Sequence, residues 1–334
     1  MPSAATPSHE HDRALAVRAR LRSLGAERPV ARLGLGLAAL GRPGYITLGH
    51  AGDLGGDRSP EAMERHAHTV LDAAGAAGVR YVDAARSYGR AEDFLGSWLA
   101  GNAPADALVG SKWGYVYTAG WRVDADPPEV KRHDAATLRA QIAESRERLG
   151  DRLALYQIHS ATPDSGVLSD AAVLEALAEL RAGGLALGVT ASGPSQVETI
   201  ERAIDLGLFD AIQATWNLHE RAAERALERA HEAGLAVIVK EALANGRLSP
   251  RGADPRLEAA AAAAETTSDA LALAAALARP WADVVLSGAA SVATLGSNLR
   301  AARLSWSDAL EERLGPLRED SPGYWDRRGR LPWA

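Results

Sequence analysis

Three short apolar segments end in polar side chains that could carry out acid–base chemistry together. Asp83 ends the first segment and Tyr88 follows it closely, Lys112 ends the second segment, and His159 ends the third. If these segments are parallel strands of a barrel, their carboxyl ends open on one face, where barrel proteins carry their chemistry. The sequence therefore predicts that a carboxylate, a phenol, an ammonium group and an imidazole meet in one pocket.

These four groups suit reversible proton transfer. A tyrosine with its ordinary pKa of about 10 is a poor acid at neutral pH, but an adjacent ammonium group favours the phenolate and lowers that pKa. We therefore expect Lys112 and Asp83 to adjust Tyr88 as a proton donor and acceptor, while His159 hydrogen-bonds a substrate oxygen. This chemistry fits carbonyl reduction. The hydride must come from a nicotinamide, because no side chain can supply one.

Each of the four residues also has a purely structural explanation. An aspartate at a strand end such as Asp83 is more often a cap or an ion-pair partner, and Tyr88 alone is more often a packing residue. Lys112 could be solvated, and His159 could be a hydrogen-bonded histidine at the rim. Their joint occurrence, in order, at three successive strand ends favours the catalytic interpretation.

The elements that must position these residues alternate along the chain. Apolar segments predicted as strands are Ala31–Leu37, Arg80–Asp83, Ala107–Lys112, Arg152–Ile158, Leu185–Thr190, Ala211–Thr215, Ala236–Lys240 and Asp283–Leu286. Segments with helical periodicity are Pro60–Ala77, Glu92–Ala100, Ala135–Leu149, Leu168–Arg181, Pro194–Leu206, Glu220–Ala233, Ser268–Ala278 and Ser291–Ala302. Repeated strand–helix units imply parallel strands with right-handed crossovers. Eight such units predict an α/β fold of the closed (β/α)₈ TIM barrel type.

We expect one barrel domain over residues 1–334, with its core at about residues 30–302 and a tail at residues 1–9. An extra amphipathic helix is expected at His11–Leu24. The competing architecture is a doubly wound open sheet, which usually shows Gly-x-Gly-x-x-Gly before its first helix. The segment Leu33–Leu37 has two such glycines but neither the third glycine nor a following helix, so we predict a barrel strand there.

Three segments outside the repeated units are candidates for substrate recognition. The connections Gly41–Ser59 and Trp113–His133 are too long to be simple turns, and long loops of this kind are usually functional. The C-terminal tail, Ser305–Ala334, carries several aromatic residues. It either covers the mouth of the barrel or buries its own aromatic rings. Aromatic loops suggest an apolar or ring-bearing substrate, although sugars also stack on aromatic rings.

Composition limits the function class. The 334 residues are 47% hydrophobic and 24% charged, with a net charge of -6 and no cysteine. No basic cluster with interleaved aromatics indicates a nucleic-acid surface, no apolar run could span a bilayer, and no secretory signal is visible. The lack of cysteine excludes disulfides and thiolate metal sites. We expect a cytoplasmic protein without a metal site, whose partner is a small molecule, and the oligomeric state stays open.

At these residues the chain resembles the aldo-keto reductase superfamily over roughly residues 30–302. The family segment Asp-Thr-Ala-x-x-Tyr-Gly-x-(Ser/Ala)-Glu corresponds to residues 83–92, its Thr-Lys pair to Ser111-Lys112, and its Ile-His pair to Ile158-His159. The resemblance implies a (β/α)₈ barrel and a catalytic tetrad. Within that tetrad, Tyr88 would be the general acid, Lys112 and Asp83 would tune it, and His159 would orient the carbonyl.

The resemblance also implies contacts to a nicotinamide cofactor, NADP(H) in preference to NAD(H). Gln213 would hold the carboxamide, Trp216 would stack on the nicotinamide, and Thr190 keeps a hydroxyl of the fifth strand. The remaining expected cofactor residues are Leu243, Arg251, Gly288 and Asn298. Glu241 is unexpected where a pyrophosphate would lie, because a carboxylate repels phosphate. Lys240 or Arg251 would have to compensate it.

Three functions follow as hypotheses. The first is an NAD(P)(H)-dependent oxidoreductase that interconverts an aldehyde or ketone and an alcohol, with Tyr88 as general acid and base. The second is a regulatory subunit that senses a nicotinamide cofactor with little turnover, suggested by the unusual Lys240-Glu241 pair. The third is a barrel that has lost nucleotide binding, suggested by Ala290 and Thr294 at positions where polar residues often hold phosphates.

Overall fold

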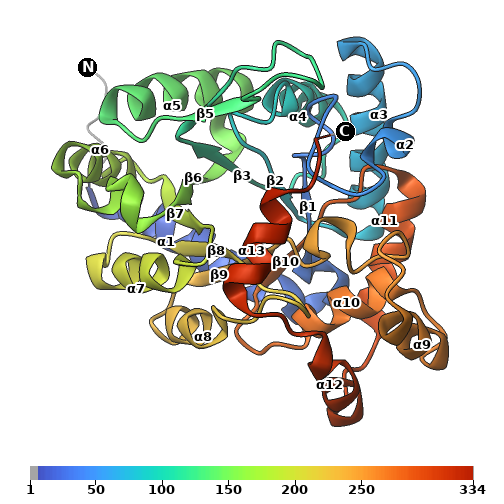
Figure 1. Ribbon diagram of the computed structural model, residues 1–334. Coiled ribbons are helices and arrows are strands. Elements are labelled where there is room, and N and C mark those ends of the chain that lie inside the picture. Colours follow the sequence, from blue (N-terminus) through green and yellow to red (C-terminus); the bar gives the residue numbers. More distant parts are fainter. Residues whose placement is uncertain (1–6, 334) are drawn as a thin grey trace.

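The computed structural model describes residues 7–333, and its centre is a closed barrel of eight parallel strands (Figure 1). The strand order around the barrel is β1-β10-β9-β8-β7-β6-β3-β2. Each strand therefore pairs with the barrel strands before and after it in the chain, and the last strand pairs with the first. The predicted (β/α)₈ TIM barrel is confirmed.

Each of the eight predicted strand segments overlaps one barrel strand. They are β1 (Leu33–Gly36), β2 (Tyr81–Asp83), β3 (Leu108–Trp113), β6 (Leu153–Ala161), β7 (Ala186–Ala191), β8 (Ala211–Thr215), β9 (Ala236–Lys240) and β10 (Val284–Ser287). The helices of the repeated units are α3 (Pro60–Ala77), α4 (Ala91–Gly101), α5 (Ala135–Leu149), α6 (Ala171–Ala182), α7 (Gln196–Leu206), α8 (Glu224–Glu232), α10 (Ser268–Leu277) and α11 (Val292–Leu299).

The structure adds elements in the long connections and at both ends. These are α1 (Pro7–Glu27), α2 (His50–Leu54), the two-stranded sheet β4 (Tyr115–Tyr117) and β5 (Glu129–Lys131), α9 (Pro255–Ala263), α12 (Asp308–Leu314) and α13 (Ser321–Gly329). The helix expected at His11–Leu24 is longer than predicted, and the expected tail at 1–9 overlaps it. Residues 1–6 lie outside the described residues.

Local capping fixes where the helices begin. Ser59 accepts a hydrogen bond from the backbone of Ala62 and is followed by Pro60 in the first turn, so α3 begins as predicted. The sixth helix begins at Ala171, three residues later than expected, because Asp170 caps it and Val167–Ser169 forms a 3₁₀ turn instead. Polar capping residues therefore outweigh apolar periodicity at this boundary.

Strand register decides which side chains face the inside of the barrel. Asp83 pairs with Gly110 and Lys112 pairs with Gln157, so Asp83, Lys112 and Gln157 share the inner face. Glycine is required at Gly34, because a Cβ atom there would lie 2.8 Å from Leu286 and 3.0 Å from Tyr81. The inner face thus carries polar groups near the carboxyl ends of the strands and packed apolar groups near their amino ends.

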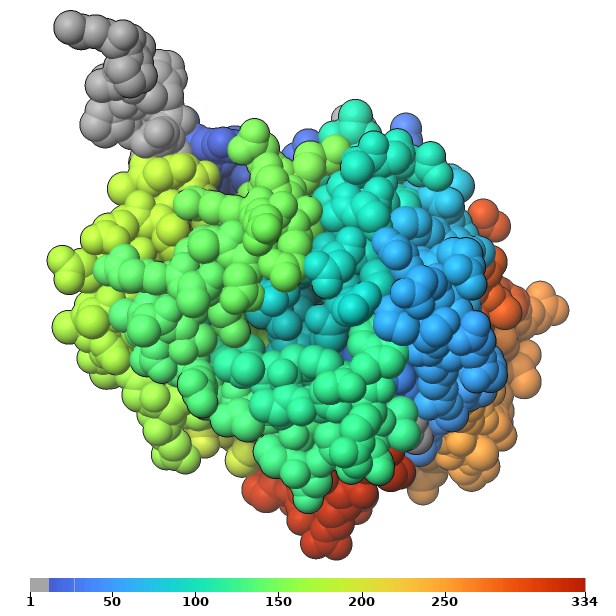
Figure 2. Space-filling model, turned by 90° about the horizontal axis from the view of Figure 1, so that it is seen from above, coloured from blue at the N-terminus to red at the C-terminus, as the bar shows by residue number. Residues whose placement is uncertain are grey.

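The two ends of the chain cover opposite ends of the barrel. Buried Ala14 and Leu21 of α1 pack with Leu155, Ile238 and other inner-face residues. The helix α13 instead crosses the end where the strands finish, in front of the barrel in Figure 1. Figure 2 shows one flank of the barrel, which is formed mainly by the first half of the chain, with the red C-terminal segment at its lower edge. Among residues 7–333, no helix combines the length and apolar character needed to cross a membrane.

Candidate active site

The four predicted catalytic residues meet at the carboxyl end of the barrel. Lys112 Nζ donates to the Asp83 carboxylate and, at 3.0 Å, to the carbonyl oxygen of Ala84. The same ammonium group lies 3.4 Å from Tyr88 Oη, which in turn lies 3.5 Å from His159 Nε2. Asp83 and Lys112 are almost completely buried. The phenol oxygen therefore stands between a buried cation and an imidazole.

Asp83 is held in place from several strands. Its Oδ1 accepts hydrogen bonds from Tyr81 Oη at 3.0 Å, Gln157 Nε2 at 3.2 Å and Gln213 Nε2 at 3.1 Å. Its other oxygen, Oδ2, accepts a hydrogen bond from the Lys112 ammonium group. Buried charges are stable only when they are paired and hydrogen-bonded, and this carboxylate meets both conditions. Lys112 is thereby fixed in direction.

The electrostatics differ from the sequence prediction at Tyr88. Burial and the Asp83 carboxylate raise the pKa of Tyr88 above its ordinary value, although the Arg42 guanidinium opposes this. The expected lowering of the pKa of Tyr88 by Lys112 is wrong for this structure, because burial and the Asp83 charge outweigh the nearby ammonium group. Burial and the Lys112 charge hold the pKa of His159 well below its usual range. Tyr88 is therefore a protonated phenol and His159 a neutral imidazole at neutral pH.

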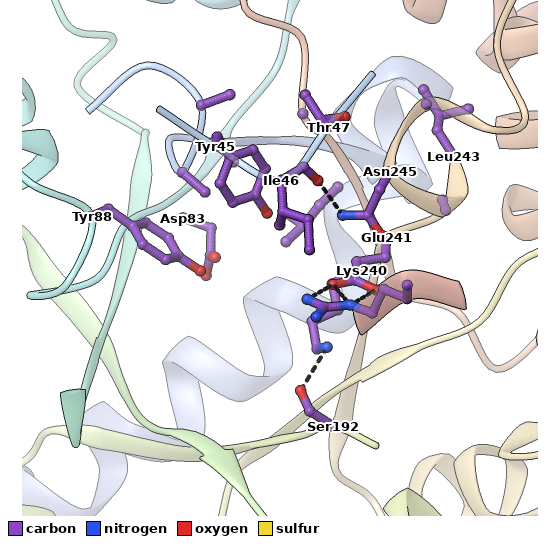
Figure 3. Close-up of a pocket in the computed structure, with 18 of the residues that line it drawn as sticks. Tyr45, Ile46, Thr47, Asp83, Tyr88, Ser192, Lys240, Glu241, Leu243 and Asn245 are labelled. Carbon is purple, nitrogen blue, oxygen red and sulfur yellow. Dashed lines mark hydrogen bonds and ion pairs between the residues drawn. The ribbon is translucent and has the colours of Figure 1, made fainter. Parts of the chain in front are cut away.

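The tetrad opens into a cavity of about 560 Å³, within the range of small-molecule and cofactor sites. Its walls come from the strand ends, the connection after β1, the β4–β5 hairpin and the C-terminal tail. In Figure 3, Tyr88 and Asp83 lie on one side and Leu243 and Asn245 on the other, with Ile46 and Thr47 between them. Asn245 Nδ2 donates to the carbonyl of Ile46 at 2.9 Å, which joins two connections across the cavity.

Six of the seven predicted cofactor residues line this cavity: Thr190, Gln213, Leu243, Arg251, Gly288 and Asn298. Four of them already have protein partners, and one of these is Asn298, whose Nδ2 donates to Ser287 Oγ at 2.8 Å. Gln213 is bound to Asp83, and Arg251 forms a two-pronged ion pair with Asp53 at 2.5 and 2.8 Å. Thr190 Oγ1 accepts the backbone N–H of Ser160 at 2.6 Å.

Trp216 does not lie at the cavity. Gln213 faces the inside of the barrel, so the side chain three residues later points toward the helices. The Trp216 ring is fully buried there, with its centroid 5.9 Å from that of Trp281 and the Arg279 guanidinium 5.0 Å from its own centroid. The sequence prediction that it stacks on a nicotinamide does not agree with this placement.

The cavity contains residues that the sequence prediction missed. Arg42 lies beside three aromatic rings, those of Tyr45, Tyr88 and Trp333, at 4.6 to 5.1 Å from their centroids. Trp333 belongs to the tail, so the alternative in which the tail covers the mouth of the barrel is confirmed. Only the aromatic content of these segments indicated a role in the sequence.

The negative charge of Glu241 is balanced by a residue that the sequence did not indicate. Its carboxylate pairs with Arg328 of α13, at 2.6 Å, rather than with Lys240 or Arg251. Burial alone would raise the pKa of Glu241, but Arg328 and Lys240 together lower it to about 2. Lys240 Nζ instead donates to Ser192 and Thr215 at 2.9 and 3.0 Å, and burial lowers its pKa to about 8.

Some of the residues with positive φ lie at the same place. Ser160 and Glu241 have positive φ values of 52° although neither is glycine, and each directly follows a strand residue that lines the cavity. Residues in this region cost about 1–3 kcal/mol and persist where function uses them. The strain supports a functional role for these two strand ends.

Two buried side chains of the cavity leave an acceptor open to a bound ligand such as a nicotinamide cofactor. The side-chain oxygens of Asn245 and Asn298 are buried acceptors without a hydrogen-bond partner among the described residues. A ligand N–H or O–H group would satisfy them. Gly288, the residue directly after β10, has nothing within 4 Å of its Cβ position, which leaves room for a ligand against the backbone. These residues therefore offer unpaired acceptors and open space to a ligand in this part of the cavity.

A model of the Aldo/keto reductase family matches residues 32–311, well over half of the 334 residues. This chain belongs to the aldo/keto reductase family.

Three curated relatives can be aligned with different fractions of this chain. D-threo-aldose 1-dehydrogenase of Pseudomonas sp is 30% identical over 201 residues, 55% of this chain and 61% of the relative. Aldo-keto reductase str7 of Strobilurus tenacellus is 26% identical over 237 residues, which are 68% of this chain and 65% of that relative. Pyridoxal 4-dehydrogenase of Microbacterium luteolum is 27% identical over 273 residues, which are 72% of this chain and 77% of that relative.

The chain therefore spans less than two thirds of the first two relatives. Solved aldo/keto reductase structures share the fold. The holo form of an aldo-keto reductase from Bacillus halodurans matches with a TM-score of 0.67 at 21% identity, over 86% of this chain and 91% of that one. The glycerol dehydrogenase from Gluconobacter oxydans matches with a TM-score of 0.65 at 22% identity, over 86% of this chain and 90% of that one.

Proposed function

We propose that this protein is an oxidoreductase that interconverts a carbonyl group and an alcohol, with Tyr88 as the proton donor and acceptor. The observation that carries the proposal is the contact of Tyr88 Oη with Lys112 Nζ at 3.4 Å and with His159 Nε2 at 3.5 Å, at the wall of one cavity. Membership of the aldo/keto reductase family and the dehydrogenase names of two relatives support it.

In the reductive direction, Tyr88 gives its proton to the carbonyl oxygen. The raised pKa of Tyr88 means that this proton is present at neutral pH. His159 is neutral, so one of its ring nitrogens can donate a hydrogen bond to the same oxygen. This bond orients the carbonyl without placing a positive charge beside it. Lys112 lies close enough to stabilise the phenolate that remains, and Asp83 holds the ammonium group in that direction.

The hydride would be supplied by a nicotinamide cofactor. Thr190, Gln213 and Leu243 near the tetrad, and Gly288 and Asn298 further along the cavity, are the residues that would hold it. The resemblance to the family favours NADP(H). A substrate with polar groups beside its carbonyl fits the mixed lining of aromatic rings, hydroxyl groups and lysines.

The tetrad favours turnover over the cofactor-sensing alternative. A sensor has no need for a phenol between a buried ammonium group and an imidazole, and this chain keeps that arrangement with a carboxylate held by four donors. The unusual Lys240-Glu241 pair, which suggested the sensor, is accounted for by Arg328 of the tail.

The test combines a binding titration with a panel of aldehydes and ketones. Tyr88→Phe keeps the ring and removes the acid, so we expect kcat to fall by about 10²–10⁴-fold, while the Kd of the cofactor, measured by quenching of tryptophan fluorescence, stays within about twofold. Tyr117→Phe is the matched control, since Tyr117 lies on β4 outside the cavity lining. Activity of Tyr88→Phe equal to that of the control would exclude this mechanism.

A further inference from the structure

The charges that line the cavity do not cancel. Among the described residues, four carboxylates line it, and each is paired with a cation: Asp53 with Arg251, Asp83 with Lys112, Glu129 with Arg42 and Glu241 with Arg328. Two further cations, Lys131 and Lys240, line the same cavity. Within residues 7–333, the hydrogen-bond partners of both ammonium groups are neutral oxygens, so two positive charges of the wall have no ion-pair partner.

Lys131 lies close to the reacting end of the cavity. It is the last residue of β5, and its Nζ donates to the carbonyl oxygen of Ser160, the residue after His159, at 2.9 Å. The Tyr115 ring lies near both groups, because its centroid is 5.5 Å from Lys131 Nζ and 4.9 Å from the centroid of the His159 ring. This cation and the imidazole that orients the substrate carbonyl are therefore neighbours of the same aromatic ring.

Lys240 reaches the same place from the end of β9. Its Nζ donates to Ser192 Oγ at 2.9 Å, as Figure 3 shows, and Ser192 Oγ donates in turn to Ser160 Oγ at 3.2 Å. Burial is the main cause of the low pKa of His159, and Lys240 is one of the nearby cations that lower it further. Lys240 is therefore connected to Ser160 through one hydroxyl group, and its charge acts on the imidazole.

Ser160 joins the two lysines. Its N–H donates to Thr190 Oγ1 at 2.6 Å, its carbonyl oxygen accepts from Lys131, and its hydroxyl oxygen accepts from Ser192. All of its polar groups thus have partners, which hold it at a positive φ of 52° that costs free energy. We call Lys131, Ser160, Ser192 and Lys240 the lysine–serine cluster, and all four residues line the cavity.

Ammonium groups beside hydroxyl groups suit a compact oxyanion. A carboxylate or a phosphate accepts charge-assisted hydrogen bonds from lysine, which are stronger than hydrogen bonds between neutral groups. A cation held in a protein wall without a counter-ion is costly, and a ligand anion removes that cost. The substrate carbonyl lies at Tyr88 and His159, and the cluster begins at the next residue, Ser160. Consecutive residues lie about 3.8 Å apart, which is the span of about three single bonds.

We propose that the substrate carries its carbonyl group and a compact oxyanion, a carboxylate or a phosphate, on one short chain, and that the lysine–serine cluster binds the oxyanion. This inference rests on the proposed function and names the substrate class of the same site. Lys131 and Lys240 are then specificity-determining residues, because they bind the substrate away from the reacting carbon. Ser160 and Ser192 are positioning residues, because they hold the two ammonium groups in place.

The experiment measures kcat/KM for pairs of substrates that differ in the anionic group, with the full chain and saturating NADH or NADPH. The pairs are 4-oxobutanoate against butanal, 5-oxopentanoate against pentanal, and glyceraldehyde 3-phosphate against glyceraldehyde. We expect the anionic member of at least one pair to be used about tenfold better than its neutral partner. The first two pairs test a carboxylate and the third tests a phosphate, so the result identifies which oxyanion the cluster takes.

Lys240→Met and Lys131→Met remove the charge and keep an unbranched side chain. We expect each to lower the ratio of the two kcat/KM values, by about tenfold for Lys240 and by about threefold for Lys131, which is exposed and therefore solvated. Arg132→Met is the matched control, because Arg132 is a neighbouring cation that lies outside the cavity lining, and it should leave the ratio unchanged.

The possible outcomes separate this inference from the proposed function. Equal use of both members of every pair by the unaltered protein overturns the oxyanion site but leaves the oxidoreductase intact. A preference that survives both substitutions places the anion elsewhere and also overturns the site. If the variants weaken the Kd of the cofactor, measured by tryptophan fluorescence, and keep the preference, the lysines hold the cofactor and the inference is wrong. If Lys240→Met does not fold, Lys131→Met decides alone. No turnover of any of these compounds with either cofactor overturns the proposed function itself.

Discussion

Tyr88 keeps its proton in this structure, and this gives the two directions of the reaction different dependences on pH. Carbonyl reduction uses the protonated phenol, which is present at all pH values below the raised pKa of Tyr88. Alcohol oxidation uses the phenolate, whose population rises about tenfold per pH unit below that pKa. His159 contributes no titration near its ordinary pKa, because burial and Lys112 keep it neutral.

We therefore predict that kcat/KM for reduction is flat from about pH 6 to about pH 7.5, whereas kcat/KM for oxidation rises with pH. Initial rates measured in both directions from about pH 6 to about pH 9 check it. Lys240 has a pKa of about 8 and is a further source of an inflection in the pH–rate profile. Lys240→Met should remove any inflection near that pH. A reduction profile with an apparent pKa near 6.5 would show that His159 titrates, and would contradict the neutral imidazole.

At the scale of elements, α13 is attached to the cavity by one buried ion pair. Arg328 donates to both oxygens of Glu241, whose side chain is only 9% exposed while that of Arg328 is 28% exposed. Removing one partner leaves a buried charge unpaired, which costs about 3–5 kcal/mol for a fully buried pair. Because the Arg328 guanidinium is partly solvated, we expect a smaller cost here.

The prediction is that Arg328→Gln lowers the free energy of unfolding by about 2–3 kcal/mol at pH 7. The folded-state pKa of Glu241 is about 2 against an ordinary 4.5, so its contribution is complete above pH 4.5 and is lost as the pH falls toward 2. The difference between the two proteins in urea unfolding should therefore shrink at low pH. Arg330→Gln, which breaks an exposed pair with Asp326, should cost less than about 1 kcal/mol. Equal effects of the two substitutions would mean that α13 is not held by Glu241.

The strands could be predicted from sequence because each barrel strand repeats one local rule. Apolar residues fill both faces, and a polar residue appears where the strand reaches the open end, as at Asp83, Lys112 and His159. The partner of Glu241 could not be predicted, because Arg328 lies 87 residues away and no local pattern links them. The family resemblance implied that Trp216 stacks on a nicotinamide, but the alternation of side chains along β8 turns it away from the inner face that carries Gln213.

At the scale of the whole molecule, stability and chemistry occupy opposite ends of the barrel. The inner face at the amino ends of the strands is apolar and is closed by α1 through Ala14 and Leu21, while the tetrad lies at the carboxyl ends. Barrels commonly separate the two in this way, so a loss of packing at the closed end need not disturb the active-site face. The amphipathic pattern predicted α1 as a helix outside the repeated units. It did not indicate that α1 closes the barrel, because that contact joins α1 to distant strands.

We predict that Leu21→Ala lowers the free energy of unfolding by about 2–4 kcal/mol while leaving kcat and the cofactor Kd unchanged within about twofold. Leu21 is 1% exposed and packs in the cluster that includes Leu155 and Ile238, so its truncation leaves a cavity at the closed end. Leu24→Ala is the matched control, since Leu24 is only partly buried at the edge of the same cluster and should cost clearly less. Urea unfolding and steady-state rates on the same preparations measure both quantities. A large fall in kcat without a fall in stability would mean that the closed end communicates with Tyr88, against the separation argued from the structure.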